Sequence, residues 1–314
     1  MKKKLILFLC SLYFTLFSQN KVERDTSYTE LSTFNKLIKT YPYIKIVKKK
    51  EHKNVEEIFD LVYGKSANAP LHFDAFYTKE KTVNPAVLLI HGGGWRSGNK
   101  NQMRILAAEI ASKGYACFTI EYRLSLEAKY PAGILDVKNA IKYIRKNAKK
   151  FHVDAHKIAI LGCSSGGQMA ALIGTTNKNA AFEEKNNQMS GKASTKVQAI
   201  IDIDGVLAFK HPESAEGAIA AQWLGGTFEE KPENWINASA LNHVDKNTPP
   251  TLFINSSQDR FHAGRDDMIK ILNQNNIYNE VHTIAHSPHS FWFFDPWFDQ
   301  TVGFTIQFLN TIFK

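Results

Sequence analysis

The sequence predicts an α/β fold, with a mostly parallel central sheet flanked by helices and a small cap-like insertion. Two observations lead to this prediction. Short, continuous apolar runs alternate with segments of helical periodicity from Ala86 to the end of the chain. One of these runs ends in a glycine-rich turn that contains a serine and leads directly into a helical segment. Continuous apolar runs are typical of strands buried on both faces, as in parallel sheets covered by helices.

The chain before Ala86 is less regular. Residues Lys21 to Lys50 are polar and rich in lysine, and we interpret them as an N-terminal extension with one short helix. Two segments, Tyr43–Val47 and Leu71–Tyr77, alternate apolar and polar residues. A period of two is typical of antiparallel strands with one solvated face, so we expect two such strands early in the chain.

The buried strands and the helices follow from the apolar spacing of the remaining chain. The predicted strands of this part are Ala86–Ile90, Ala116–Ile120, Ile158–Leu161, Val197–Ile203, Thr251–Asn255 and, as the last strand, Val281–Ile284. The predicted helices are Gln102–Lys113, a long helix from Pro131 through Ile144, one opening at Met169, Asp267–Leu272 and Phe304–Phe313. Residues 205–247 are richer in Pro, Trp and Gly and break this rhythm, so we interpret them as an insertion over the site within a single domain, 21–314.

The turn from Gly162 to Gly166 fits the pattern G-x-S-x-G, with Ser164 at its centre. A serine on a sharp strand-to-helix turn has a strained backbone, and side chains at the flanking glycine positions would clash with the neighbouring strand and helix. The turn also places the hydroxyl at a helix N-terminus, where free N–H groups favour a developing negative charge. The motif therefore predicts Ser164 as a nucleophile.

A second glycine run, His91 to Trp95, follows the first buried strand. A nucleophilic serine that attacks a carbonyl group generates an oxyanion, and this charge requires preorganised N–H donors. Glycines allow the backbone to approach that oxygen closely. We predict an oxyanion hole formed by the amides of Gly93, Gly94 and Ser165, with His91 bracing the loop.

A serine hydroxyl requires a base within hydrogen-bond reach and an acid that orients the base. In this kind of sheet the chain order is serine, acid, histidine. The candidate acids are Asp202, Asp204, Asp259, Asp266 and Asp267. Asp259 is favoured because it lies in the loop after a predicted strand, where catalytic groups gather.

Three histidines follow the candidate acids. His282 lies inside a predicted strand, whereas His286 and His289 share the loop after it. We favour His289 as the base, with His286 as the alternative. The interval between Asp259 and His289 leaves room for one helix and one strand.

The first twenty residues resemble a secretory signal peptide. Lys2 to Lys4 form a positive segment, Leu5–Phe17 an apolar one, and Ser18 offers a small residue for cleavage near Gln19. The apolar segment is shorter than the roughly 20 residues of a spanning helix. We therefore expect an exported protein, periplasmic or extracellular, with no stable membrane insertion; a retained membrane anchor is the alternative.

The composition argues against several classes. Hydrophobic residues make up 44% and charged residues 22% of the chain, as is ordinary for a globular protein with a substantial core. The formal charge is +9, but basic runs do not interleave with aromatics in the second half, so we expect no nucleic-acid partner. No CxxC or paired-histidine spacing indicates a metal site, and we expect no cofactor. Cys117 and Cys163 are expected to be buried free thiols.

From about Ala86 onward, the chain resembles the α/β-hydrolase superfamily. Within it, the chain is similar to the carbohydrate-esterase branch related to hormone-sensitive lipase and to bacterial feruloyl and acetyl esterases (BD-FAE-like). The last third resembles a narrower group of Bacteroidetes-type esterases linked to pectin or hemicellulose. The motifs that carry these resemblances are His91–Trp95, Glu121–Leu124, Tyr130–Ala132, Asp136–Lys138, Gly162–Gly167, Asp202–Gly205, Arg260–Arg265 and Pro288–Trp292.

The resemblance implies an α/β-hydrolase fold and a triad of Ser164, Asp259 and His289. The chain departs from the broader superfamily at Asp259 to His262, where a plainer apolar loop usually follows the acid. This departure leaves the identity of the acid open.

Export and resemblance together predict a serine esterase that removes ester groups, acetyl in the first place, from plant or algal polysaccharides or their oligosaccharides. Trp95 and Trp292 could offer flat faces to sugar rings, although core packing is an equal interpretation. The alternatives are a general carboxylesterase or lipase, a feruloyl or pectin methyl esterase, a serine peptidase and an inactive binding module. The sequence leaves the oligomeric state open.

Overall fold

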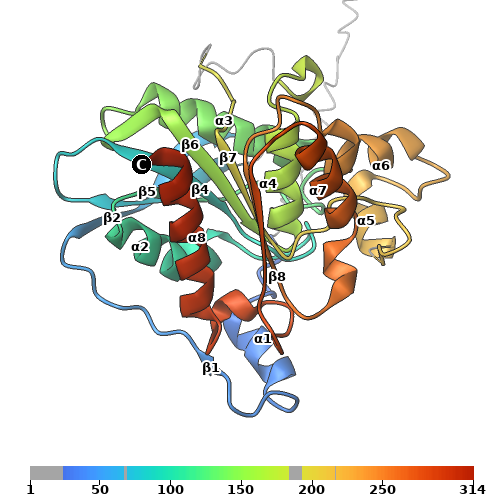
Figure 1. The fold of residues 1–314 in the computed structure, drawn as a ribbon, viewed down its shortest axis with the longest axis horizontal. Coiled ribbons are helices and arrows are strands. Elements are labelled where there is room, and N and C mark those ends of the chain that lie inside the picture. Colours follow the sequence, from blue (N-terminus) through green and yellow to red (C-terminus); the bar gives the residue numbers. More distant parts are fainter. Residues whose placement is uncertain (1–23, 67–68, 184–192, 216) are drawn as a thin grey trace, which may run out of the picture.

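An eight-stranded sheet forms the centre of the computed structural model, which describes residues 24–314 except 67–68, 184–192 and 216 (Figure 1). The signal peptide predicted for residues 1–20 lies outside the described residues. In spatial order the strands are β2 (Val55–Lys65), β3 (Pro70–Thr78), β5 (Ala116–Ile120), β4 (Asn84–Ile90), β6 (Val153–Cys163), β7 (Ala199–Ile203), β8 (Thr251–Asn255) and β9 (Asn279–Thr283). The pairs β2–β3 and β3–β5 are antiparallel, and every later pair is parallel.

Helices cover both faces of the sheet and bury two apolar cores. One core contains side chains of α2 (Arg104–Ser112) and α8 (Phe298–Phe313), and the other those of α3 (Ala132–Lys146), α4 (Ser165–Thr175) and α7 (Arg265–Gln274). The strands between these layers read as continuous apolar runs because both of their faces are buried. The α/β class predicted from the alternation of runs is therefore confirmed.

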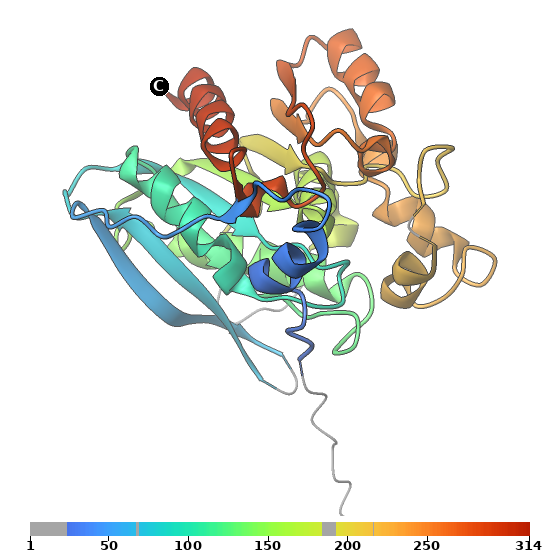
Figure 2. The same ribbon diagram turned by 90° about the horizontal axis from the view of Figure 1, so that it is seen from below.

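The two ends of the sheet carry different additions. The β2–β3 hairpin projects from one edge, and the insertion lies beyond the opposite side (Figure 2). Residues 205–247 contain α5 (Gly217–Leu224), α6 (Pro232–Ala238) and a short 3-10 turn, η3 (Ala240–His243). The N-terminal extension contains α1 (Glu30–Leu37), the one short helix predicted there.

Two early predictions differ from the structure. Tyr43–Val47 gives only β1 (Lys45–Ile46), which pairs with β10 (Phe294–Asp295) outside the main sheet, since Tyr43 is exposed and offers no continuous buried face. The long edge strand β2 was not predicted. Register shifts after Ile58 and after Val62 interrupt its period of two, so its pattern does not resemble a regular strand.

The two glycines of the serine turn are required by backbone contacts. A Cβ atom added at Gly162 would lie 1.9 Å from the carbonyl oxygen of Gly166, and one added at Gly166 would lie 2.3 Å from that of Ile90. Neither oxygen belongs to a flexible side chain. The close packing of β6, the turn and α4 therefore excludes any side chain at these positions.

Among the described residues, no helix has the length and apolar character that crossing a bilayer demands. Cys117 and Cys163 are buried free thiols.

The glycine contacts predict opposite effects for two Gly→Ala substitutions. Gly162→Ala should lower the free energy of unfolding by about 3 kcal/mol or more, because backbone must move to admit the methyl group. Gly303→Ala, in the exposed middle of α8 with no atom within 4 Å of its added Cβ, should raise it by about 0.5–1 kcal/mol through helix propensity. Urea unfolding of both variants tests this contrast, and equal effects would contradict it.

Candidate active site

Ser164 occupies a strained turn between β6 and α4. Its backbone angles are φ 57° and ψ −124°, and its N–H donates to the carbonyl of Ile203 on the adjacent strand β7 at 2.8 Å. A positive φ is uncommon for residues other than glycine and marks a site where the surrounding structure enforces strain. The turn predicted from G-x-S-x-G is therefore present, with α4 beginning at the next residue.

A chain of hydrogen bonds joins Ser164 to a histidine and a carboxylate. Nε2 of His289 lies 2.9 Å from Oγ of Ser164, and Nδ1 of His289 lies 2.6 Å from Oδ2 of Asp204. These distances are those of a nucleophile paired with its base and a base paired with its orienting acid. His289 comes from the loop that follows β9, and Asp204 follows β7 directly.

The structure corrects the acid predicted from the sequence. Asp259 begins the 3-10 turn η4 (Asp259–His262) after β8, and its side chain is exposed rather than paired with His289. Asp204 takes that place because β6 and β7 are neighbours with Cys163 opposite Ile203, so the residues that follow, Ser164 and Asp204, leave the sheet side by side. Asp204 was a candidate acid, but sequence spacing alone does not reveal this register.

The Asp204 carboxylate is fully buried, accepts two hydrogen bonds and lies close to a third N–H group. Besides His289, it receives the Ser256 N–H at 2.8 Å on Oδ1, and Nε2 of His262 lies 3.3 Å from the same oxygen. Burial alone would raise the pKa of Asp204, but its interactions with His262, His289 and Ser256 outweigh burial and lower that pKa to about 2. The site therefore contains a fixed negative charge.

The pKa of a second buried carboxyl, Asp202, is shifted in the opposite direction to that of Asp204. Burial raises the pKa of Asp202 well above its usual value, and the nearby charge of Asp204 adds to the effect. The pKa values of these two buried carboxyls are therefore shifted in opposite directions. Asp266 and Asp267 lie in the first turn of α7 and are exposed, so neither is the buried acid that orients His289.

The other histidines do not reach Ser164. His286 is exposed, with a positive φ of 56°. His282 stacks on the Phe304 ring, with 4.0 Å between ring centroids, and contacts Glu280. His91 braces the glycine loop, as expected: its Nδ1 lies 2.8 Å from the Gly92 carbonyl, and burial lowers its pKa to about 3.

Two of the three predicted oxyanion donors, Gly94 and Ser165, line the same small cavity as Ser164, and Gly93 precedes Gly94 in the loop. Gly93 and Gly94 have positive φ values of 121° and 61°, and no residue that the structure describes accepts a hydrogen bond from either amide. Ser165 is the first residue of α4, so its N–H has no partner within the helix. The amides of Gly94 and Ser165 thus lie beside Ser164 without a hydrogen-bond partner among the described residues, as suits a developing negative charge.

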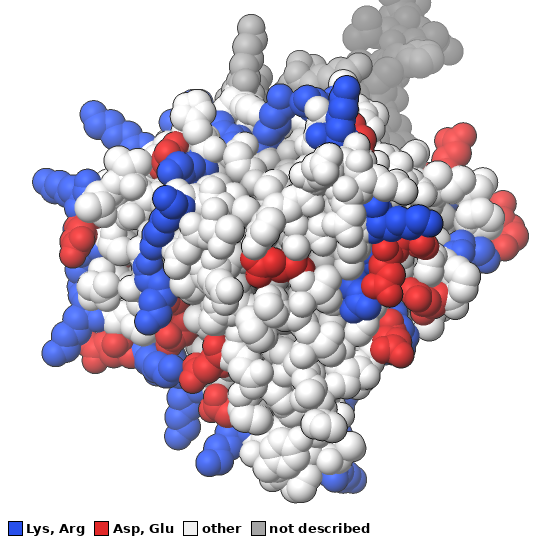
Figure 3. Space-filling model, in the orientation of Figure 1, with Lys and Arg blue, Asp and Glu red and all other residues white. Residues whose placement is uncertain are grey.

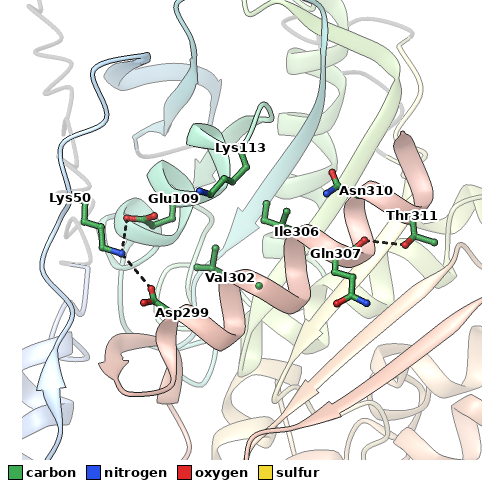
Figure 4. Close-up of a pocket in the computed structure, with 10 residues that line it drawn as sticks. Lys50, Glu109, Lys113, Asp299, Val302, Ile306, Gln307, Asn310 and Thr311 are labelled. Carbon is green, nitrogen blue, oxygen red and sulfur yellow. Dashed lines mark hydrogen bonds and ion pairs between the residues drawn. The ribbon is translucent and has the colours of Figure 1, made fainter.

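A cavity of about 20 Å³ lies beside the serine. Its lining residues are Gly94, Trp95, Ser164, Ser165, Asp204, Val206 and Phe261. One water molecule needs roughly 10–15 Å³ on this measure, so the cavity holds a group of a few atoms at most. A larger groove of about 670 Å³ lies between α2 and α8 (Figure 4), but neither Ser164, Asp204 nor His289 lines it.

The two tryptophans proposed as sugar platforms are buried. Trp95 and Trp292 are each 2% exposed. The Trp95 ring stacks on Trp223 of α5, with 4.8 Å between centroids and a 9° angle between planes, and its Nε1 donates to Oε1 of Gln168 at 2.9 Å. Neither indole offers a free face to a sugar ring. Trp95 instead lines the small cavity and anchors the insertion.

No group of three or more His, Cys, Asp or Glu side chains in the described part of the chain could hold a metal ion.

The sheet order, the helices on both faces and the strand–serine–helix turn define an α/β-hydrolase fold. The chain belongs to the BD-FAE family, which it matches over residues 73–264.

Comparisons with curated proteins and solved structures agree with this fold. The chain is 32% identical over 194 residues to Esterase LipC of Mycobacterium tuberculosis, covering 59% of this chain and 47% of LipC. It spans about half the length of the curated relatives it matches. A truncated carbohydrate esterase from gut microbiota has a TM-score of 0.69 at 23% identity, over 84% of this chain and 100% of that one. An acetyl ester-xyloside bifunctional hydrolase from Caldicellulosiruptor lactoaceticus has a TM-score of 0.69 at 21% identity, over 81% and 96%.

Two isosteric substitutions distinguish the observed acid from the predicted one. Asp204→Asn should lower kcat by about 10⁴-fold, because an amide cannot hold His289 in the required tautomer or stabilise its cation. Asp259→Asn, exposed and outside the hydrogen-bond chain, should stay within about twofold of the wild type. Initial rates with p-nitrophenyl acetate measure both, and the reverse ranking would restore Asp259 as the acid.

The lowered pKa of Asp204 also predicts acid sensitivity of the fold. A carboxyl whose pKa is lower in the folded state stabilises the protein above its unfolded value, near 4, and this stabilisation is lost as the pH falls toward 2. It amounts to about 2–3 kcal/mol in the wild type and is absent from Asp204→Asn. Urea unfolding at pH 5 and pH 2.5 should therefore show a smaller loss in the variant; equal losses would contradict the lowered pKa.

Proposed function

We propose that the protein is an exported serine esterase that removes acetyl groups from plant or algal polysaccharides or their oligosaccharides. The observation that carries the proposal is the hydrogen-bonded chain from Ser164 through His289 to Asp204. Family membership and the esterase relatives support the reaction class.

In the proposed mechanism, Oγ of Ser164 attacks the ester carbonyl while Nε2 of His289 takes the hydroxyl proton. The negative charge that forms on the carbonyl oxygen is received by the amides of Gly93, Gly94 and Ser165. Asp204 keeps the imidazole oriented and stabilises its positive charge. His289 then gives its proton to the leaving sugar oxygen, which leaves an acyl group on Ser164.

The second half of the reaction uses water in place of the sugar. His289 removes a proton from the water as it attacks the acyl carbon, and the same three amides receive the charge again. The proton passes to Oγ of Ser164 as the acyl–oxygen bond breaks. Acetic acid leaves and releases its proton to the solvent, and the enzyme returns to its starting state.

The size of the cavity favours acetyl as the acyl group. A space of about 20 Å³ beside Ser164 suits a methyl group, whereas a feruloyl group would need room for an aromatic ring. Two of the lining side chains, Trp95 and Phe261, are held by ring stacking, so the wall on that side is fixed. A preformed, small acyl site is the physical basis for preferring short acyl chains.

The polysaccharide part of the proposal rests on relatives and on the predicted leader. One structural neighbour is named a carbohydrate esterase and another an acetyl ester-xyloside hydrolase. An exported esterase would meet polymeric substrates outside the cell. Lys and Arg side chains are mixed with Asp and Glu around the rim of the face seen in Figure 3, so charge alone does not choose between neutral and acidic sugars.

The proposal is tested with purified wild type and Ser164→Ala. The wild type should hydrolyse p-nitrophenyl acetate at least tenfold faster than the butyrate in kcat/KM, and release acetate from acetylated xylan or pectin. Ser164→Ala should lose about 10³-fold or more in kcat while folding and substrate binding persist. Release of ferulate or methanol in preference to acetate would overturn the acyl assignment, and cleavage of peptide p-nitroanilides the esterase class.

A further inference from the structure

The loop after β8, residues 258–264, does not supply the acid, yet it touches both members of the acid–base pair. We call it the β8 loop. Its Phe261 ring stacks on the His289 imidazole, with 3.5 Å between centroids and a 10° angle between planes. The guanidinium carbon of Arg260 lies 4.1 Å from the centre of the same ring. The base is therefore covered by an aromatic face that limits its rotation.

The next residue of the β8 loop, His262, faces the acid. Its side chain is 7% exposed, and Nε2 lies 3.3 Å from Oδ1 of Asp204. The contact falls outside hydrogen-bond geometry, and no polar atom of the described residues forms a hydrogen bond with this buried nitrogen. The contact is longer than the 2.6 Å bond to His289, so it is the weaker of the two that the carboxylate makes with imidazoles.

An arginine fixes which nitrogen of His262 carries the proton. Nη1 of Arg265 lies 3.3 Å from Nδ1 of His262 and 3.0 Å from Oδ1 of Asn255. A guanidinium only donates hydrogen bonds, so Nδ1 of His262 must accept. The proton of the neutral ring is then on Nε2, the ring nitrogen that lies 3.3 Å from Oδ1 of Asp204. The chain of contacts thus runs from Arg265 through His262, Asp204 and His289 to Ser164.

We propose that His262 is a positioning residue that holds the Asp204 carboxylate in the orientation its bond to His289 requires, with Arg265 fixing the tautomer of His262. The inference rests on the proposed serine-esterase function. It assigns a task to the segment Asp259 to His262, where the sequence departs from a plain apolar loop. His262 touches neither Ser164 nor the cavity beside it, so it acts through Asp204 alone.

The geometry explains why a carboxylate in this place needs a second support. Asp204 follows β7 immediately, in a positive-φ conformation, and has no exposed surface through which water could satisfy it. Oδ2 is taken by His289, and Oδ1 has the Ser256 amide and His262. Removing the His262 imidazole takes away one of the polar neighbours of this buried charge. The carboxylate can then rotate away from the geometry that orients His289.

A matched pair of substitutions tests the proposal. Gln at position 262 can place an amide nitrogen where Nε2 was, whereas Leu has similar bulk and no donor. We expect His262→Leu to lower kcat on p-nitrophenyl acetate about 10–30-fold with KM within twofold, and His262→Gln to recover kcat to within about threefold of the wild type. The far-downfield proton signal of the Asp204–His289 bond should broaden or move in His262→Leu and persist in His262→Gln.

If the proposed function is wrong, the wild type itself will lack esterase activity, and this result is distinct from the effects of the variants. With an active wild type, equal kcat values for wild type and His262→Leu, equal losses in Leu and Gln, or a change confined to KM would overturn the positioning role. If His262→Leu does not fold, Arg265→Met tests the same proposal, because it removes the group that fixes the tautomer of His262. A loss of about threefold or more in kcat at constant KM, restored by Arg265→Lys, would support the role, and an unchanged kcat would overturn it.

Discussion

The ionised carboxylate of Asp204, buried at the end of β7, is the interaction on which the site depends. A buried charge without partners costs several kcal/mol, so the surrounding structure must supply donors. Here two later segments hydrogen-bond the carboxylate, through the Ser256 amide at the end of β8 and His289 after β9. A third segment, the β8 loop, brings His262 to within 3.3 Å of it. Satisfying one charge therefore fixes the relative positions of the loops that follow three consecutive strands of the sheet. The bond that orients the base is one part of that arrangement.

The acyl side of the site is held by a different set of contacts, centred on Trp95. The indole lies at the end of the glycine loop, stacks on Trp223 of the insertion and donates to Gln168 on α4. The Gln168 amide in turn donates to the carbonyl of Ala238 at 2.7 Å. The glycine loop, the serine helix and the insertion are thus joined through buried side chains. The small cavity beside Ser164 is set by core packing and not by a loose lid, so its size is a preorganised property of the fold.

Much of the fold could be predicted because its signals are local. Continuous apolar runs located the parallel strands, and G-x-S-x-G located a turn whose glycines are required by contacts with Gly166 and Ile90 backbone atoms. The acid could not be chosen, because Asp204 and Asp259 both follow parallel strands, and only register and side-chain direction separate them. Strand β2 was missed because its register shifts disrupt the alternation that identifies edge strands. The spacing of apolar residues indicates which side chains are buried, but it does not indicate which residues a buried side chain contacts.

The β8 loop shows how adjacent strands can divide one task between them. Strands β7 and β8 are neighbours in the parallel sheet, so the loops that follow both of them open at the same edge, beside the loop that holds His289. An acid on either loop could in principle reach the base. Once the acid follows β7, the β8 loop is free to carry groups that hold the acid–base pair from outside, and Phe261 and His262 contact its two members in succession. Phe261 and His262, where a plain apolar loop is usual, are then the sequence feature that accompanies an acid on the β7 loop. The feature has this meaning only because β7 and β8 are neighbours in the sheet, and the sequence alone does not give that order.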